Sequence, residues 1–117
     1  MALLENTERY YSELDENAVN GVKTITSPFE DGIEYDIYTR FYAFTNHWLI
    51  RIVEKNGGKE ISTGWRRLAV GNSLNLEYKN VMQYNIGCES IFSFDPDTPD
   101  AWNNGWTKLF VSKWENA

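Results

Sequence analysis

The tripeptide at 56–58, Asn-Gly-Gly, lies between two predicted strands, in the first of which Trp48, Ile50 and Ile52 alternate with Leu49 and Val53. Asn-Gly and Gly-Gly pairs favour the left-handed backbone of a two-residue hairpin turn, and alternation is the period of a half-buried strand. The first segment covers 47–55, and the second covers 59–70 with a predicted bulge or bend at Gly64. The sequence therefore predicts an antiparallel hairpin over 47–70.

Alternation also marks the long segment 33–44, which follows a shorter strand predicted at 22–27. Further short strands, each bounded by Gly, Asn or Ser, are predicted at 74–78, within 81–94 and at 106–114. Strands without intervening helices indicate a mainly β protein, an antiparallel β-sandwich or barrel. A chain of 117 residues has the length of one domain, so we expect a single domain over 1–117, β-rich from 22 to 114.

One segment, 2–16, has helical spacing. Leu3, Tyr10 and Leu14 recur every three to four residues and would form one apolar stripe. Asn17 and the Asn-Gly pair that follows would end this N-terminal α-helix. Its acidic C-terminal end opposes the helix dipole, so the helix would depend on packing against the β-rich part.

The chain carries a net charge of −6, but its middle is basic: segment 38–67 holds six Arg or Lys against two Glu. An acidic protein is poorly suited to nonspecific nucleic-acid binding, so nucleic acid is not an expected partner. Cys88 is the only cysteine, and neither a signal-type N-terminus nor a long apolar run occurs. These features predict a cytoplasmic protein without a transmembrane segment.

Residues for catalysis are scarce. His47 is the only histidine, and no glycine-rich phosphate loop occurs. Asp95, Asp97 and Asp100 carry oxygen ligands, but Pro99 and the missing glycine depart from the calcium-loop pattern. We therefore expect no enzyme, no cofactor and no metal, with a small enzyme as a third alternative.

The segment 95–106, DPDTPDAWNNGW, is the first candidate binding surface. Flat indoles beside amide and carboxylate groups can cover an apolar ligand face and bind its polar edge. The alternative is a long turn in which Trp106 points inward. The candidate residues are Asp100, Trp102, Asn103, Asn104 and Trp106.

The basic middle of the chain is the second candidate. If its three strands are neighbours, several aromatic and arginine side chains share one sheet face, where they could bind a partner or simply be solvated. Arg66 and Arg67 are consecutive, so only one of them can lie on any one face. The candidate residues are Arg40, Trp48, Arg51, Trp65 and Arg66, with Tyr38, Tyr42, His47 and Arg67 beside them.

Together these features predict a non-catalytic binding protein that recognises a protein partner. Aromatic and arginine residues dominate protein interfaces, and an acidic inhibitor, an immunity-type protein or a phage or accessory assembly protein would have this composition. Self-association through open strand edges is a further expectation. The alternative is a module that binds a glycan or a lipid head group.

Overall fold

The computed structural model describes residues 10–12, 21–71, 73–90 and 107–114, which contain eight strands and one short 3-10 helix. Every pairing between these strands is antiparallel, so the prediction of a mainly β, antiparallel protein is confirmed. The elements are β1 (Tyr10–Ser12), β2 (Gly21–Thr26), β3 (Glu34–Tyr42), β4 (His47–Asn56), β5 (Lys59–Ser62), β6 (Arg66–Arg67), the 3-10 helix Leu76–Tyr78, β7 (Asn85–Ser90) and β8 (Thr107–Ser112).

The larger sheet has the order β2-β3-β4-β5, and β6 also pairs with β4. Its β4–β5 hairpin closes at the pair Asn56 and Lys59, and φ is 59° at Gly57 and 87° at Gly58. Both turn residues therefore adopt the left-handed conformation that glycine tolerates best, as the predicted hairpin requires.

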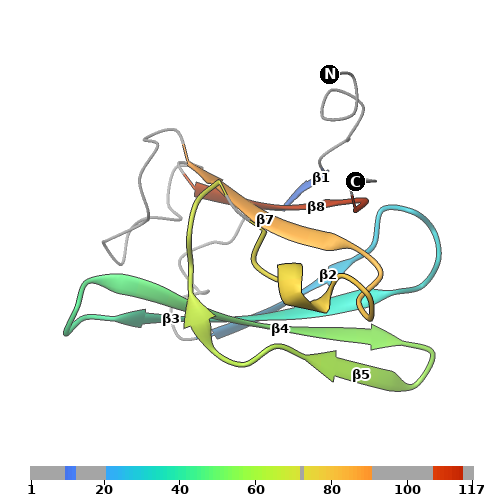
Figure 1. Cartoon of the computed structure of the whole chain (residues 1–117), viewed down its shortest axis with the longest axis horizontal. Coiled ribbons are helices and arrows are strands. Elements are labelled where there is room, and N and C mark those ends of the chain that lie inside the picture. Colours follow the sequence, from blue (N-terminus) through green and yellow to red (C-terminus); the bar gives the residue numbers. More distant parts are fainter. Residues whose placement is uncertain (1–9, 13–20, 72, 91–106, 115–117) are drawn as a thin grey trace.

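The smaller sheet has the order β1-β8-β7 and lies above the larger sheet in Figure 1. One hydrophobic cluster contains buried side chains from both sheets. The two sheets therefore share one core, to which alternate residues of their strands point. Its members include Tyr35, Ile37, Trp48, Ile50 and Ile52 from the larger sheet, and Ile86, Cys88, Leu109 and Val111 from the smaller one. The strand order of each sheet runs from edge to edge, so the described strands form no closed barrel.

The predicted helix over 2–16 is wrong where the structure describes it. Residues 10–12 form β1, in which Tyr10 pairs with Val111 and Ser12 pairs with Leu109. The edge of β8 offers backbone hydrogen bonds to an incoming strand, and consecutive tyrosines favour an extended backbone. Tertiary pairing therefore overrides the helical spacing of the apolar residues, and the remainder of 2–16 lies outside the described residues.

The predicted bulge at Gly64 is present. Ser62 pairs with Val53, whereas Arg66 pairs with Ile50, so residues 63–65 stand opposite only two residues of β4. The hydroxyl of Thr63 accepts a hydrogen bond from the backbone N–H of Ile52 at 2.9 Å, which stabilises the interrupted ladder. Beyond the bulge, every side chain points to the face opposite to the one that continuous pairing would give it.

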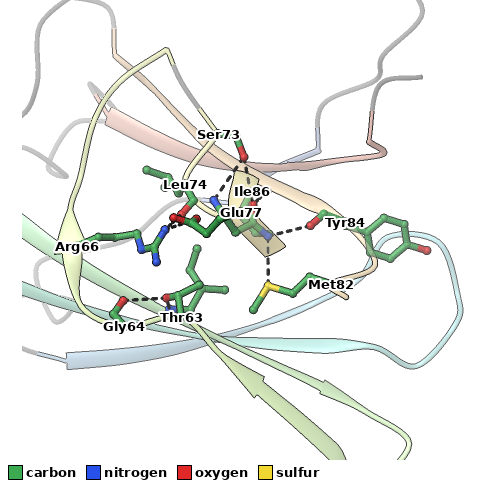
Figure 2. A network of polar contacts seen from close by, with 11 residues as sticks. Thr63, Gly64, Arg66, Ser73, Leu74, Glu77, Met82, Tyr84 and Ile86 are labelled. Atoms are coloured by element: carbon green, nitrogen blue, oxygen red, sulfur yellow. Dashed lines mark hydrogen bonds and ion pairs between the residues drawn. The ribbon is translucent and has the colours of Figure 1, made fainter. Parts of the chain in front are cut away.

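The predicted strand at 74–78 is a turn and a 3-10 helix instead. Asn75 is fully buried, accepts a hydrogen bond from the N–H of Ile86 and donates one to the carbonyl of Tyr84, both at 3.0 Å. Figure 2 shows this polar network, with Arg66 on one side, Tyr84 on the other and Ile86 between them. The side chain of Asn75 therefore takes the place of a strand partner and bends the chain toward β7.

No helix in the described part of the chain is long and apolar enough to cross a membrane.

Candidate functional site

The larger sheet has one face toward the core and one outer face. In β4, Trp48, Ile50 and Ile52 are fully buried in the core, so the alternate residues, among them Leu49 and Arg51, point to the outer face. Cross-strand partners share a face, which extends this assignment to β3 and β6. We call one group on this outer face the Arg-aromatic patch: Tyr38, Arg40, Leu49, Arg51, Trp65 and Arg67.

Arg40 and Trp65 form one contact of the patch. The guanidinium carbon of Arg40 lies 4.9 Å from the centroid of the Trp65 ring, which is a cation–π geometry. Arg40 is exposed and Trp65 remains 41% exposed, so both groups are accessible from solvent. The bulge creates this contact, because continuous pairing would place Trp65 opposite Ile50 and therefore on the core face.

Arg51 and Tyr38 form the second contact. They are direct cross-strand partners, and the guanidinium carbon lies 5.0 Å from the tyrosine ring centroid. The Nε–H of Arg51 donates to the hydroxyl of Ser62 at 3.0 Å, and that hydroxyl donates to the carbonyl of Thr63 at 2.8 Å. This contact leaves both terminal nitrogens of Arg51 as donors. Ser62 was not among the predicted site residues, although the hairpin register places it diagonally across from Arg51.

The acidic groups of the outer face lie at its other end. Asp36 is 7% exposed, and its carboxylate binds the Lys55 ammonium at 2.7 Å and accepts a hydrogen bond from Thr24 at 2.7 Å. The hydrogen bond from Lys55 outweighs the opposing effect of burial and, with the bond from Thr24, lowers the pKa of Asp36. The same contact with Asp36 raises the pKa of Lys55. Asp36 and Lys55 therefore neutralise each other.

His47 lies beside the patch in contact with Tyr42. Their rings are stacked with centroids 5.9 Å apart, and Nδ1 of His47 lies 2.6 Å from the Thr45 hydroxyl. Among the described hydrogen bonds, none joins the imidazole of His47 to a carboxylate. A catalytic triad needs such a group to orient its histidine, and this arrangement does not supply one.

Two predicted binding residues do not belong to this face. Trp48 is fully buried, with its ring 5.5 Å from that of Phe41, so it is a core residue and not a surface contact. Arg66 lies on the core side opposite Ile50, where it donates to the Leu74 carbonyl at 3.0 Å and pairs with Glu77 (Figure 2). The consecutive arginines are thus on opposite faces, as their spacing requires.

The structure therefore brings together Arg40, Arg51 and Trp65 of the predicted residues, with Tyr38 and Arg67 as neighbours on the same face. The other candidate surface, with Asp100, Trp102, Asn103, Asn104 and Trp106, lies outside the described residues. Among the residues that the structure does describe, no group of three His, Cys, Asp or Glu side chains could hold a metal ion. No protein-family model matches this chain, and no curated protein sequence matches it either.

Proposed function

We propose that this protein is a non-catalytic binding protein that recognises a protein partner through the Arg-aromatic patch. In this proposal the two sheets form an open β-sandwich, and the outer face of the larger sheet is the recognition surface. An inhibitor, an immunity-type protein and an assembly protein are the classes that would use such a surface.

The observation that carries the proposal is the pair of stacked contacts, Arg40 on Trp65 and Arg51 on Tyr38. Arginine and aromatic side chains contribute most of the binding energy at protein interfaces. Stacking holds each guanidinium in place before a partner arrives, which lowers the entropy that binding would otherwise cost. Four residues of the patch, Tyr38, Arg40, Leu49 and Arg51, lie on the regular strands β3 and β4, and such elements position a binding group more firmly than loops do.

A second candidate function is recognition of a lipid head group or a glycan. The observation that favours it is the β3–β4 turn, where Phe44 is 90% exposed and the neighbouring Tyr42 is 47% exposed. An aromatic residue that projects from a turn can insert at a membrane interface or stack on a sugar ring. Sedimentation with anionic and zwitterionic liposomes, and a glycan panel, would test wild type against Phe44→Ser.

Affinity capture from a lysate of the source cells tests the leading proposal. Wild type, a Trp65→Ala/Arg40→Ala variant and a Val81→Ala control would be immobilised and the captured proteins identified by mass spectrometry. Val81 is 58% exposed in the loop that precedes β7 and is not a residue of the Arg-aromatic patch. We expect one stoichiometric protein with wild type and the control, and its loss with the double variant. Equal capture by all three would refute recognition through the patch.

A further inference from the structure

We propose that the ligand of the Arg-aromatic patch is an extended acidic polypeptide segment, whose alternate carboxylates pair with Arg40 and Arg51. This inference rests on the proposed function and adds the chemistry of the partner.

The charge of the outer face changes along the strands. At the end near the β4–β5 turn, Glu34, Asp36 and Glu60 face the same way as Lys55. At the other end lie Arg40, Arg51 and Arg67, and their cross-strand partners in the described pairings are Leu49 and Tyr38 rather than acidic residues. Within the described residues, neither Arg40 nor Arg51 has an ion-pair partner. The patch therefore complements a negative surface although the whole chain has a net charge of −6.

The stacked contacts determine which groups a ligand meets. A guanidinium that lies over a ring keeps the N–H donors at its planar edge available, and two of these donors match the two oxygens of a carboxylate. Arg40 lies over Trp65, and Arg51 uses only Nε–H for Ser62. The patch thus presents two pre-oriented guanidinium forks.

The spacing of the two arginines fits an extended chain. Arg40 pairs with Leu49, and Arg51 is two residues further along β4, so the two arginines are diagonal neighbours. The backbones of such neighbours are about 7–8 Å apart, and the backbones of residues i and i+2 along an extended strand are about 6.6 Å apart. Acidic residues at positions i and i+2 of an extended segment would therefore reach both arginines together.

The same contacts favour a polypeptide over a single-stranded nucleic acid. Binding of single strands depends on open aromatic faces on which bases stack. Arg40 already occupies one face of the Trp65 ring, and Arg51 occupies one face of the Tyr38 ring. The net charge of −6 also repels a long polyanion more strongly than a short acidic segment.

Fluorescence anisotropy with labelled peptides tests the inference. The probe is a fluorescein-labelled peptide in which Glu and Thr alternate, and the matched peptide has Gln in place of every Glu. A third peptide carries the same number of Glu residues in adjacent pairs, and a labelled oligothymidylate of similar length is the nucleic-acid arm. We expect binding of the alternating Glu peptide, weaker binding of the paired-Glu peptide, and none of the Gln peptide.

Variants assign the binding to the patch. Arg40→Ala and Arg51→Ala should each weaken binding about tenfold, because each removes a charged hydrogen-bonding partner. Arg40→Lys keeps the charge but loses the planar fork, so its affinity should lie between those of wild type and Arg40→Ala. Lys59→Ala removes one positive charge at the turn end of β5, away from the patch, and should leave the affinity within about twofold of wild type. Circular dichroism would show that each variant is folded.

The inference would be overturned if folded wild type did not bind the alternating Glu peptide at a peptide concentration of about 1 mM, where only very weak binding would be missed. It would also be overturned if the arginine substitutions left binding of this peptide unchanged, or if oligothymidylate bound more tightly than the peptide. If the capture experiment finds a partner that depends on Trp65 and Arg40 while the peptide fails, only the acidic ligand is wrong. If both experiments fail, the patch does not bind a protein partner.

Discussion

The ring of Phe110 covers Gly87, its direct cross-strand partner in the smaller sheet. A Cβ atom added at Gly87 would lie 2.3 Å from Cζ of this ring, far inside van der Waals contact. Phe110 is only 7% exposed although it alternates with the core residues Leu109 and Val111 and so points to the other face. The absence of a side chain at Gly87 is thus what allows the ring to lie this close to β7.

We expect Gly87→Ala to destabilise the fold by about 1–3 kcal/mol, because the new methyl group must displace a buried ring. Chemical denaturation would measure the loss in free energy of unfolding. Gly64→Ala is the matched control, since nothing lies within 4 Å of a Cβ atom at that position. In a Phe110→Ala background the penalty of Gly87→Ala should shrink. An equal penalty in both backgrounds would show that the ring contact is not the cause.

A buried polar contact joins β3 and β4 to the segment that precedes β7. Tyr35 is fully buried, and its hydroxyl donates to the carboxylate of Glu54 at 2.7 Å and accepts from the N–H of Tyr84 at 3.2 Å. The same oxygen of Glu54 accepts from the N–H of Gln83 at 2.7 Å. Burial, and then the contact with Glu54, raise the pKa of the Tyr35 phenol far above its ordinary value.

Tyr35→Phe should therefore cost about 1–3 kcal/mol in the free energy of unfolding, because Glu54 and the Tyr84 N–H each lose a partner. Tyr42→Phe is the control, as its side chain is 47% exposed. Denaturation at neutral pH would measure both changes. A loss for Tyr42→Phe equal to that for Tyr35→Phe would contradict the assignment of the effect to the buried contact.

Alkaline titration gives an independent test of the same contact. A phenol whose pKa is raised in the folded state adds stability below its unfolded pKa of about 10, and this stability is lost as the pH rises further. Wild type should therefore lose stability more steeply above pH 10 than Tyr35→Phe does. Denaturation midpoints at several alkaline pH values would show this difference, and parallel curves would argue against a raised pKa for Tyr35.

Acid should destabilise the fold in part through protonation of Asp36. Because contacts with Lys55 and Thr24 lower its pKa in the folded state, Asp36 adds stability above its unfolded value of about 4. That stability is lost as the pH falls through the folded-state pKa. We expect Asp36→Asn to lower the denaturation midpoint at pH 7 and to converge with wild type in acid. Glu30→Gln, an exposed site in the turn before β3, should change the midpoint little. If the denaturation midpoints of Asp36→Asn and wild type still differed in strong acid, the difference would not come from the ionised Asp36 carboxylate.

Asn75 should be required for the connection between β6 and β7. Its side chain binds the backbone of both Tyr84 and Ile86, so Asn75→Ala leaves a buried carbonyl and a buried N–H without those partners. We expect a loss of about 2–3 kcal/mol in the free energy of unfolding. Asn80→Ala, at an exposed position in the same connection, should stay within about 0.5 kcal/mol of wild type. Similar losses for both variants would mean that the buried network is not responsible.

The β character of the chain and its central hairpin follow from local patterns in the sequence. Alternation of side chains and the glycines at 57 and 58 act locally, because each depends only on the backbone conformation of a few neighbouring residues. The same local pattern put Arg66 and Arg67 on opposite faces.

Which residues meet at the candidate site depends on contacts in the folded protein. The extra residue at 63–65 reverses the faces of Trp65 and Arg66, and the sequence indicates a bulge at Gly64 without showing which side chains it moves outward. Likewise, Trp48 is a core residue because the face of β4 that carries it packs against the smaller sheet, and residues 10–12 form a strand because β8 has an edge to pair with. Such outcomes depend on contacts between segments distant in the chain, which a local pattern does not contain.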